Sequence, residues 1–124
     1  MKIYGFEKLV VWQDARQLCS LLYKNTKDFP KDELFGITSQ IRRAGISITC
    51  NIAEGTSRWS QKEKIRFIEI AYGSLMGVLN CTILASDLEY LSDETYLQIR
   101  EKVDQVSFML TNLKKSFENK SGEG

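Results

Sequence analysis

The chain has 124 residues, 43% hydrophobic and 27% charged, proportions typical of one globular domain with one core. Its net charge of +1 is too small for a protein that binds polyanions with its whole surface, so nucleic-acid binding would need a local basic patch. The absence of histidine excludes Cys/His zinc sites and removes the commonest general base, so we expect a non-enzymatic protein without metal or cofactor.

The N-terminal sequence MKIYGFEKLVVWQ lacks the apolar core and cleavage site of a signal peptide, and the chain has no run of about 18 apolar residues. We therefore expect a cytoplasmic protein that makes no membrane contact. Cys19, Cys50 and Cys81 are odd in number and widely spaced, which predicts buried, reduced thiols.

The first predicted helix runs from Lys8 to Lys27. Apolar residues recur there at spacings of four and three, at Val11, Ala15, Leu18 and Leu22. Pro30 ends the segment, because the residue before a proline is disfavoured in the helical region. A short turn at residues 31–33 follows.

The second predicted helix runs from Leu34 to Glu54, with Gly55 as the left-handed residue after its C-cap. At about 100° per residue, one face is apolar and should meet the core, with Ile37, Ile41, Ala44, Ile48 and Ile52. A polar stripe lies beside it, formed by Gln40, Arg43, Ser47, Asn51 and Glu54. Arg42 falls on a different side.

Three interpretations of this polar stripe remain open. The first is a polar seam between helices or subunits, in which an Arg43–Glu54 type of network would fix the register. The second is a phosphate or ligand contact made by Arg42 or Arg43. The third is plain exposure to solvent.

The third predicted helix begins at the capping-box sequence of Ser60 to Glu63 and extends to Leu91. It is apolar on two nearly opposite sides. One side carries Ile65, Ile68, Tyr72, Leu75, Leu79 and Ile83, and the other carries Phe67, Ile70, Ala71, Val78, Cys81 and Leu88. Two apolar sides predict burial on two sides, which a second copy of the chain would supply. The alternative is a helix that is central in its own bundle.

The expected oligomer interface follows from this helix. Gly73, Ser74 and Gly77 leave a groove for another helix, and the predicted interface comprises Phe67, Ile70, Gly73, Ser74, Gly77 and Val78.

The fourth predicted helix is capped at Ser92-Asp93 and carries a narrow apolar seam, formed by Ile99, Val103, Val106, Leu110, Leu113 and Phe117. The tail from residue 120 to 124 has nothing to bury and is expected to be disordered, so residues 1–119 form the domain. Four helices with short connections predict an all-α, antiparallel up-and-down four-helix bundle.

Basic residues collect around the connection between the second and third predicted helices, at Arg58, Lys62, Lys64 and Arg66. Free backbone N–H groups at the helix start add positive potential, and Trp59 offers a surface for stacking on a base. With Arg42 and Arg43, these residues form the predicted nucleic-acid-binding set. The alternative is a solvated cap with Trp59 packed on the bundle.

The chain also resembles a known family through most of its length. The matching segments are residues 9–15, Phe29-Pro30, 33–36, 38–44, Ser47-Ile48, 51–55, Arg58, Ser60, Glu63, Phe67, Ala71, 73–75, Leu88 and Tyr90-Leu91. The blocks Ser-Gln-Ile-Arg-Arg and Asn-Ile-Ala-Glu-Gly carry the resemblance. They are similar to those of the bacterial four-helix-bundle family encoded in intervening sequences of 23S ribosomal RNA genes, sometimes labelled a ribosomal protein.

The resemblance implies a homopentameric ring and a relation to the accessory proteins of diversity-generating retroelements, which associate with a reverse transcriptase and nucleic acid. Two positions depart from the family pattern. Thr49 stands where the family usually has proline, which predicts a milder kink in the second helix. Gly77 and Leu79 replace frequent glutamates, which makes the third helix more apolar.

We therefore expect a self-assembling bundle that binds RNA or a nucleoprotein partner through its basic residues. One alternative is a protein–protein scaffold with no nucleic-acid contact. Another is a small-molecule binder that uses the polar stripe between subunits.

Overall fold

The computed structural model describes residues 1–123 of the chain, with the side chains of residues 1–120. Four helices dominate this part, α1 (Val10–Thr26), α2 (Ile37–Thr56), α3 (Gln61–Asp87) and α4 (Asp93–Glu123). Two short 3₁₀ helices, η1 (Gly5–Lys8) and η2 (Lys31–Glu33), precede α1 and α2. Residues 1–123 contain no β-strand, so this part of the chain is all-α.

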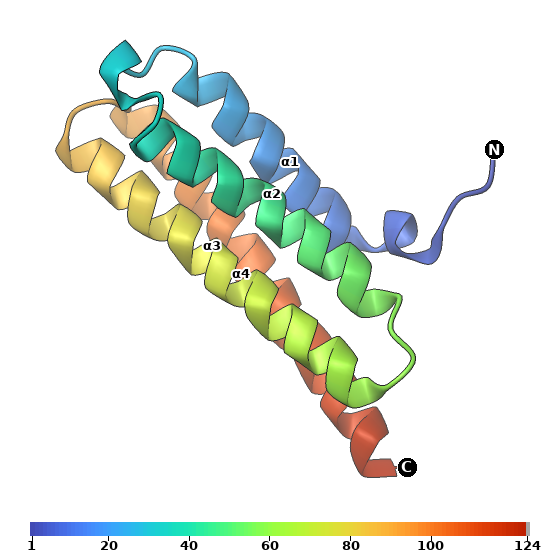
Figure 1. Cartoon of the computed structure of the whole chain (residues 1–124). Helices are drawn as coiled ribbons and strands as arrows, with labels where there is room; N and C mark the ends of the chain where they lie inside the picture. Colours follow the sequence, from blue (N-terminus) through green and yellow to red (C-terminus); the bar gives the residue numbers. More distant parts are fainter. Residues whose placement is uncertain (124) are drawn as a thin grey trace.

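Each helix packs on the helices before and after it, and α1 and α4 close the bundle (Figure 1). Successive helices run in opposite directions, as short connections require. The end of α2, the start of α3 and the C-terminal part of α4 therefore lie at one end of the bundle (Figure 1).

The core lies where the four apolar faces meet, and the predicted periodic residues supply it. Val11, Ala15, Leu18 and Leu22 of α1 are buried, as are Ile41, Ile48 and Ile52 of α2. The seam of α4 is also confirmed, because Ile99, Val103, Val106, Leu110 and Phe117 are buried in the same cluster.

Ser60 and Ser92 cap α3 and α4 as the sequence predicts, but only the serine half of the predicted capping box is present, and the Glu63 carboxylate pairs with Arg66. The Ser60 Oγ accepts a hydrogen bond from the Glu63 backbone N at 3.1 Å, and the Ser92 Oγ accepts one from the Thr95 backbone N at 3.1 Å. Each hydroxyl satisfies a backbone donor that the first helical turn leaves free.

The predicted end of the second helix was wrong. Gly55 lies inside α2 with ordinary helical geometry, and α2 continues to Thr56. A Cβ atom at Gly55 would lie 2.6 Å from the Phe67 Cβ of α3. The glycine therefore allows α2 and α3 to approach closely, and its role is packing rather than a left-handed turn. The helix is continuous through Thr49.

The predicted end of the third helix was also too late, because α3 ends at Asp87 rather than Leu91. Glu89 has a positive φ of 62°, and the Tyr90 backbone N donates to the Ala85 carbonyl oxygen at 2.9 Å. This hydrogen bond closes the C-terminal turn in the manner usually supported by glycine.

The helix α4 continues to Glu123, beyond the residue at which disorder was expected to begin. Gly124 lies outside the described residues, and disorder from residue 120 to 124 stays a prediction.

The three cysteines are unpaired, but they are not uniformly buried. Cys19 and Cys81 are half-buried, and burial raises the pKa of both thiols, with a smaller contribution from Cys50 at Cys19. Cys50 is exposed, so its predicted burial was wrong.

By length and composition, one helix of the described residues, α3, is long and apolar enough to cross a membrane. Its most apolar window has a mean hydropathy of 1.5, with 33% of that window buried in the bundle. This is weak support for a membrane span, because the core helix of a globular bundle passes the same test. The expected absence of membrane contact stays a prediction.

Candidate nucleic-acid interface

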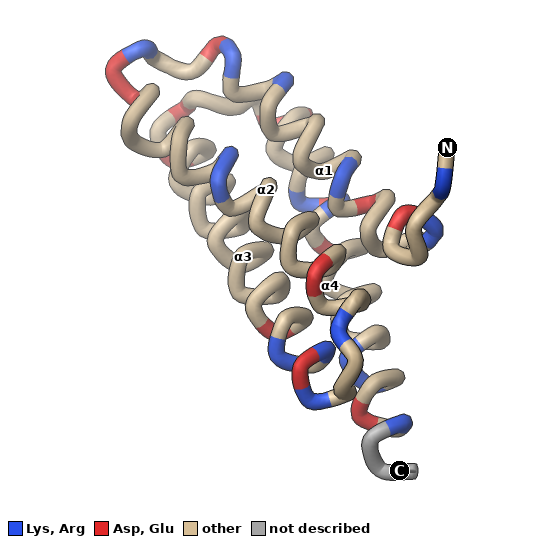
Figure 2. Tube along the Cα trace, turned by 45° about the vertical axis from the view of Figure 1, so that its right-hand side comes forward, with Lys and Arg blue, Asp and Glu red and all other residues tan. Residues whose placement is uncertain are grey.

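The two ends of the bundle carry charges of both signs but differ in which sign predominates, although the net charge is only +1. We call the end where α2 meets α3 the basic end, and define it by Arg58, Lys62, Lys64 and Arg66 with Lys114, Lys115 and Lys120 of α4 (Figure 2). The opposite end carries carboxylates in and beside its two loops, at Asp28, Asp32, Glu33, Asp87, Glu89, Asp93 and Glu94. The local basic patch that a polyanion would need is therefore present at one end.

Trp59 lies in the connection between α2 and α3 and is 99% exposed. The alternative of a tryptophan packed on the bundle was therefore wrong. Its exposed indole stands beside Arg58 in the sequence and just before the first turn of α3.

Arg58 and Arg66 share one aromatic ring. The guanidinium carbon of Arg58 lies 4.6 Å from the centre of the Phe67 ring, and that of Arg66 lies 5.6 Å from it. Each arginine also pairs with a carboxylate, Arg58 with Glu54 at 3.6 Å and Arg66 with Glu63 at 3.4 Å. These pairs are exposed and therefore weak, so a phosphate can compete for either guanidinium group.

Lys64 projects in a different direction from the two arginines. Its Nζ donates to the Thr56 carbonyl oxygen at 3.1 Å and lies 5.6 Å from the centre of the Phe117 ring. The ammonium group thus sits at the C-terminus of α2, where the helix dipole favours a cation. Lys62 is exposed.

The structure separates Arg42 and Arg43 from the basic end. Arg42 Nε donates to the Thr26 Oγ1 at 2.8 Å, and its guanidinium carbon lies 4.6 Å from the centre of the Tyr23 ring. Arg42 therefore joins α2 to the last turns of α1. Arg43 is exposed, and the fifteen residues to Arg58 correspond to roughly 20 Å along a helix.

The polar stripe is partly a seam between α2 and α3. The Ser47 and Ser74 hydroxyl oxygens are 2.8 Å apart, and Asn51 Nδ2 donates to the Ser47 carbonyl oxygen at 2.8 Å. Gln40, Arg43 and Glu54 are exposed, and the carboxylate of Glu54 pairs with Arg58. The expected Arg43–Glu54 type of network is therefore absent from the described structure.

Two members of the predicted oligomer interface lie inside the chain's own core. Val78 is fully buried and Phe67 nearly so, and that part of the expected interface was wrong. Ile70 and Gly73 are exposed, whereas Ser74 and Gly77 are half-buried beside α2.

The buried face of α3 takes residues from both of the predicted apolar sides. Ile68 and Leu75 come from one side and Ala71 and Val78 from the other. Of the other apolar side chains of α3, Ile65, Met76, Leu79 and Cys81 are half-buried. Exposed ones lie on the two flanks of the buried face, at Ile70, Tyr72, Ile83 and Leu84, with Leu88 just after the helix. A single copy of the bundle therefore leaves part of the apolar surface of α3 exposed.

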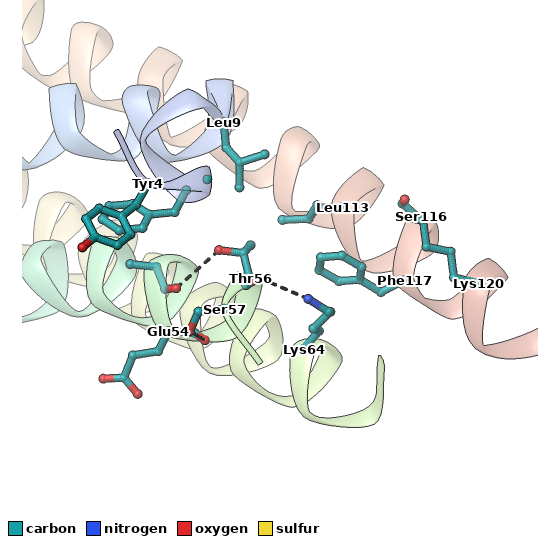
Figure 3. Close-up of a pocket in the computed structure, with 13 residues that line it drawn as sticks. Tyr4, Leu9, Glu54, Thr56, Ser57, Lys64, Leu113, Ser116, Phe117 and Lys120 are labelled. Carbon is teal, nitrogen blue, oxygen red and sulfur yellow. Dashed lines mark hydrogen bonds between the residues drawn. The ribbon is translucent and has the colours of Figure 1, made fainter. Parts of the chain in front are cut away.

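A cavity of about 590 Å³ opens at the basic end. Three separate parts of the chain form its walls, with Tyr4 and Leu9 near the N-terminus, Thr56 and Lys64 at the connection of α2 and α3, and Leu113 and Phe117 of α4 (Figure 3). We call it the end cavity. The sequence did not predict it, because no local pattern indicates that segments so far apart in the chain will meet.

Among the described residues, no group of three or more histidine, cysteine or acidic side chains is placed to hold a metal ion.

Comparison with known proteins gives a consistent result. A family model described as the 23S rRNA-intervening sequence protein matches residues 7–112. No curated protein sequence matches the chain.

Among solved structures, one similar chain is a protein of unknown function from the S23 ribosomal protein family of Bacteroides thetaiotaomicron, with a TM-score of 0.77 at 24% identity. The match covers 86% of this chain and 99% of that chain, and at this identity it supports the fold alone. The family match extends over most of the sequence and agrees with the resemblance inferred from residues. The chain belongs to the 23S rRNA-intervening sequence protein family.

Proposed function

We propose that the protein is a non-enzymatic, cytoplasmic module that binds RNA, or the RNA of a nucleoprotein partner, through its basic end. The observation that carries the proposal is the fully exposed side chain of Trp59, which is close in sequence to Arg58, Lys62 and Arg66. Tryptophan is usually largely buried, and an indole open to solvent is available for a partner to cover.

The chemistry of the basic end suits a nucleic acid. The indole can stack on a base, while the neighbouring cations neutralise phosphates. Because Glu54 and Glu63 already pair with the two arginines, the binding is expected to be weak and sensitive to salt. The acidic opposite end would repel the same polyanion, so the electrostatic field favours one end only.

The experiment measures retention of a labelled single-stranded RNA in low salt. Trp59→Ala should weaken binding by about tenfold, since stacking on one base is worth about 1–3 kcal/mol. Reversal of charge at Lys62, Lys64 and Arg66 should abolish retention.

The matched control reverses three exposed lysines near the opposite end, Lys24, Lys27 and Lys31. That variant should retain RNA as the wild type does. Failure of the wild-type protein to bind RNA in low salt would contradict the proposal, as would equal losses in the two charge-reversed variants.

We also propose that the bundle self-associates, as the ring of five copies that the family resemblance implies. The exposed apolar flanks of α3 support this, with Leu84 and Leu88 about half exposed. A single-chain species in sedimentation at tens of micromolar would contradict it.

The competing function is a scaffold that binds a protein and no nucleic acid. Phe35 favours it, because this aromatic side chain is 93% exposed in the loop farthest from the basic end. Under that function, variants of the basic end would leave every interaction of the protein unchanged. The relation to retroelement accessory proteins likewise stays a prediction.

A further inference from the structure

We propose that the end cavity receives one unpaired nucleotide, so that the protein selects single-stranded over duplex nucleic acid. This inference rests on the proposed function and names the form of its ligand. It is carried by the place and the chemistry of the cavity, which opens beside the connection that presents Trp59.

The lining of the end cavity is mostly apolar. Aromatic and aliphatic side chains of Tyr4, Leu9, Leu113 and Phe117 dominate the walls, and the volume of about 590 Å³ lies within the range of pockets that hold small organic molecules. Tyr4 is more than half exposed, so it can cover a base that enters. A nucleobase is a flat apolar body with a polar edge, and it fits such walls.

The charged side chains that line the end cavity are mostly cationic. Lys64 and Lys120 both line it, and the contact of Lys64 with the Thr56 carbonyl oxygen holds one ammonium group in place. The carboxylate of Glu54 points away from the cavity (Figure 3), where it pairs with Arg58. A phosphate group would therefore meet cations at the mouth without a facing carboxylate.

The end cavity also offers small polar groups to the edge of a base. Ser57 and Ser116 line the cavity, and the Ser57 Oγ already donates to the Glu54 carbonyl oxygen at 2.7 Å. That hydroxyl keeps its lone pairs free to accept from an amino group. The Ser116 side chain is exposed and free to rotate toward a ligand.

These features distinguish single-stranded from duplex nucleic acid, because a paired base in a duplex hides both its faces and its pairing edge. Trp59 and the end cavity recognise faces and edges, whereas the lysines recognise phosphates in either form. A base in a duplex would have to leave the stack to enter the cavity, which costs a few kcal/mol. An unpaired base enters without that penalty.

The test compares three fluorescent probes of one sequence, a 12-nucleotide RNA, the same strand as DNA, and the RNA duplex. The wild type should bind a single strand at least about tenfold more tightly than the duplex, the difference expected for one stacked base. Preference for the RNA over the DNA strand would assign a role to the 2′-hydroxyl, and equal binding would assign recognition to the base and phosphate alone.

The decisive variant is Ser116→Leu, which replaces a small polar group of the cavity lining with a larger apolar one, without altering charge or the exposed Trp59. It should reduce the preference for single strands severalfold while leaving affinity for the duplex unchanged. Ser20→Leu makes the same exchange on the exposed face of α1 and serves as the control, with circular dichroism to confirm that both variants fold.

The outcomes separate the two proposals. Equal affinity of the wild type for single strand and duplex, or an undiminished preference in Ser116→Leu, would overturn the inference and leave the proposed function standing. Binding to none of the three probes would overturn both.

Discussion

Glu89 is the one non-glycine residue of the described chain with a positive φ, at 62°. A side chain in the left-handed region is less favourable by about 1–2 kcal/mol than in the right-handed one, because its Cβ crowds the following carbonyl oxygen. The turn after α3 nevertheless needs this geometry, since it lets the Tyr90 backbone N reach the Ala85 carbonyl oxygen. The residue is therefore tolerated for the turn it closes rather than for a contact of its carboxylate.

Glu89→Gly should raise the free energy of unfolding by about 0.5–1 kcal/mol, because glycine adopts this conformation without a Cβ penalty. Urea denaturation measures the change. Lys27→Gly is the control, because the C-cap residue of α1 has an ordinary φ of −60°, and the same exchange there should lower stability. A gain at Lys27 as large as at Glu89 would contradict the explanation.

Gly55→Ala should lower the free energy of unfolding by about 1–3 kcal/mol. The added methyl group would overlap the Phe67 side chain, and both lie in packed surroundings where relaxation shifts the backbone. Thermal or urea denaturation measures the change in the free energy of unfolding. Unchanged stability would show that α2 and α3 can separate at this point without loss.

At the end of the bundle opposite the basic end, two loops contact each other. The Tyr90 hydroxyl donates to the Glu33 Oε2 at 2.9 Å, and the rings of Tyr90 and Phe29 are 5.4 Å apart. The loop between α1 and α2 is thereby joined to the loop between α3 and α4. The contact holds the two loops together at an end of the bundle where they add few residues to the hydrophobic core.

The hydrogen bond to Glu33 is the main cause that raises the pKa of Tyr90 above its ordinary value of about 10. The folded protein then holds this proton more tightly than the unfolded chain, so the contribution is complete below about pH 10 and is lost as the pH rises through the raised pKa. Wild-type stability should therefore fall more steeply above pH 10 than that of Tyr90→Phe. Chemical denaturation from pH 8 to 11 measures both slopes, and parallel curves would contradict the assignment.

The helices were predictable because their apolar residues follow a strict period and their starts carry side-chain caps. Ser60 and Ser92 cap α3 and α4 as predicted, and most of the α4 seam from Ile99 to Phe117 is buried. Local sequence could not distinguish a glycine that turns the chain from one that admits a neighbouring helix, and Gly55 shows the second use.

Some residues of the candidate site could likewise be predicted from the sequence, and others could not. The basic stretch after Arg58 is contiguous, so the sequence located it, but the sequence could not show that Arg42 contacts Tyr23 and Thr26 on another helix. Phe117 was predicted only as a core residue and Lys120 only as part of the tail, because only the folded bundle brings them beside Lys64. The adjacent residues Lys114 and Lys115 late in α4 were the one available signal.

The proposed self-association would use the flank of α3 that no other described helix covers. Gly73 is exposed in the middle of this helix, and a Cβ there would meet nothing within 4 Å. In an isolated bundle such a glycine is less favourable than alanine by about 1 kcal/mol. Close approach of a helix from a second copy of the chain would explain why position 73 is a glycine.

Gly73→Leu should stabilise the fold of the single bundle and at the same time weaken self-association, because the larger side chain keeps the second helix away. Sedimentation velocity and urea denaturation measure the two effects on the same sample. Glu101→Leu adds the same side chain to the exposed face of α4 and should leave the oligomer intact. Association that is unchanged in Gly73→Leu would place the subunit contact elsewhere.

The separation of acidic and basic groups along the bundle axis constrains any particle built from several copies. Rotational symmetry about an axis parallel to the bundle would set all the basic ends on one rim and all the acidic ends on the other, giving a two-faced disc. Nucleic acid would then coat one face while the other stays bare and available to proteins. Discs could also stack face to back, with attraction that fades as added salt shortens the range of the field.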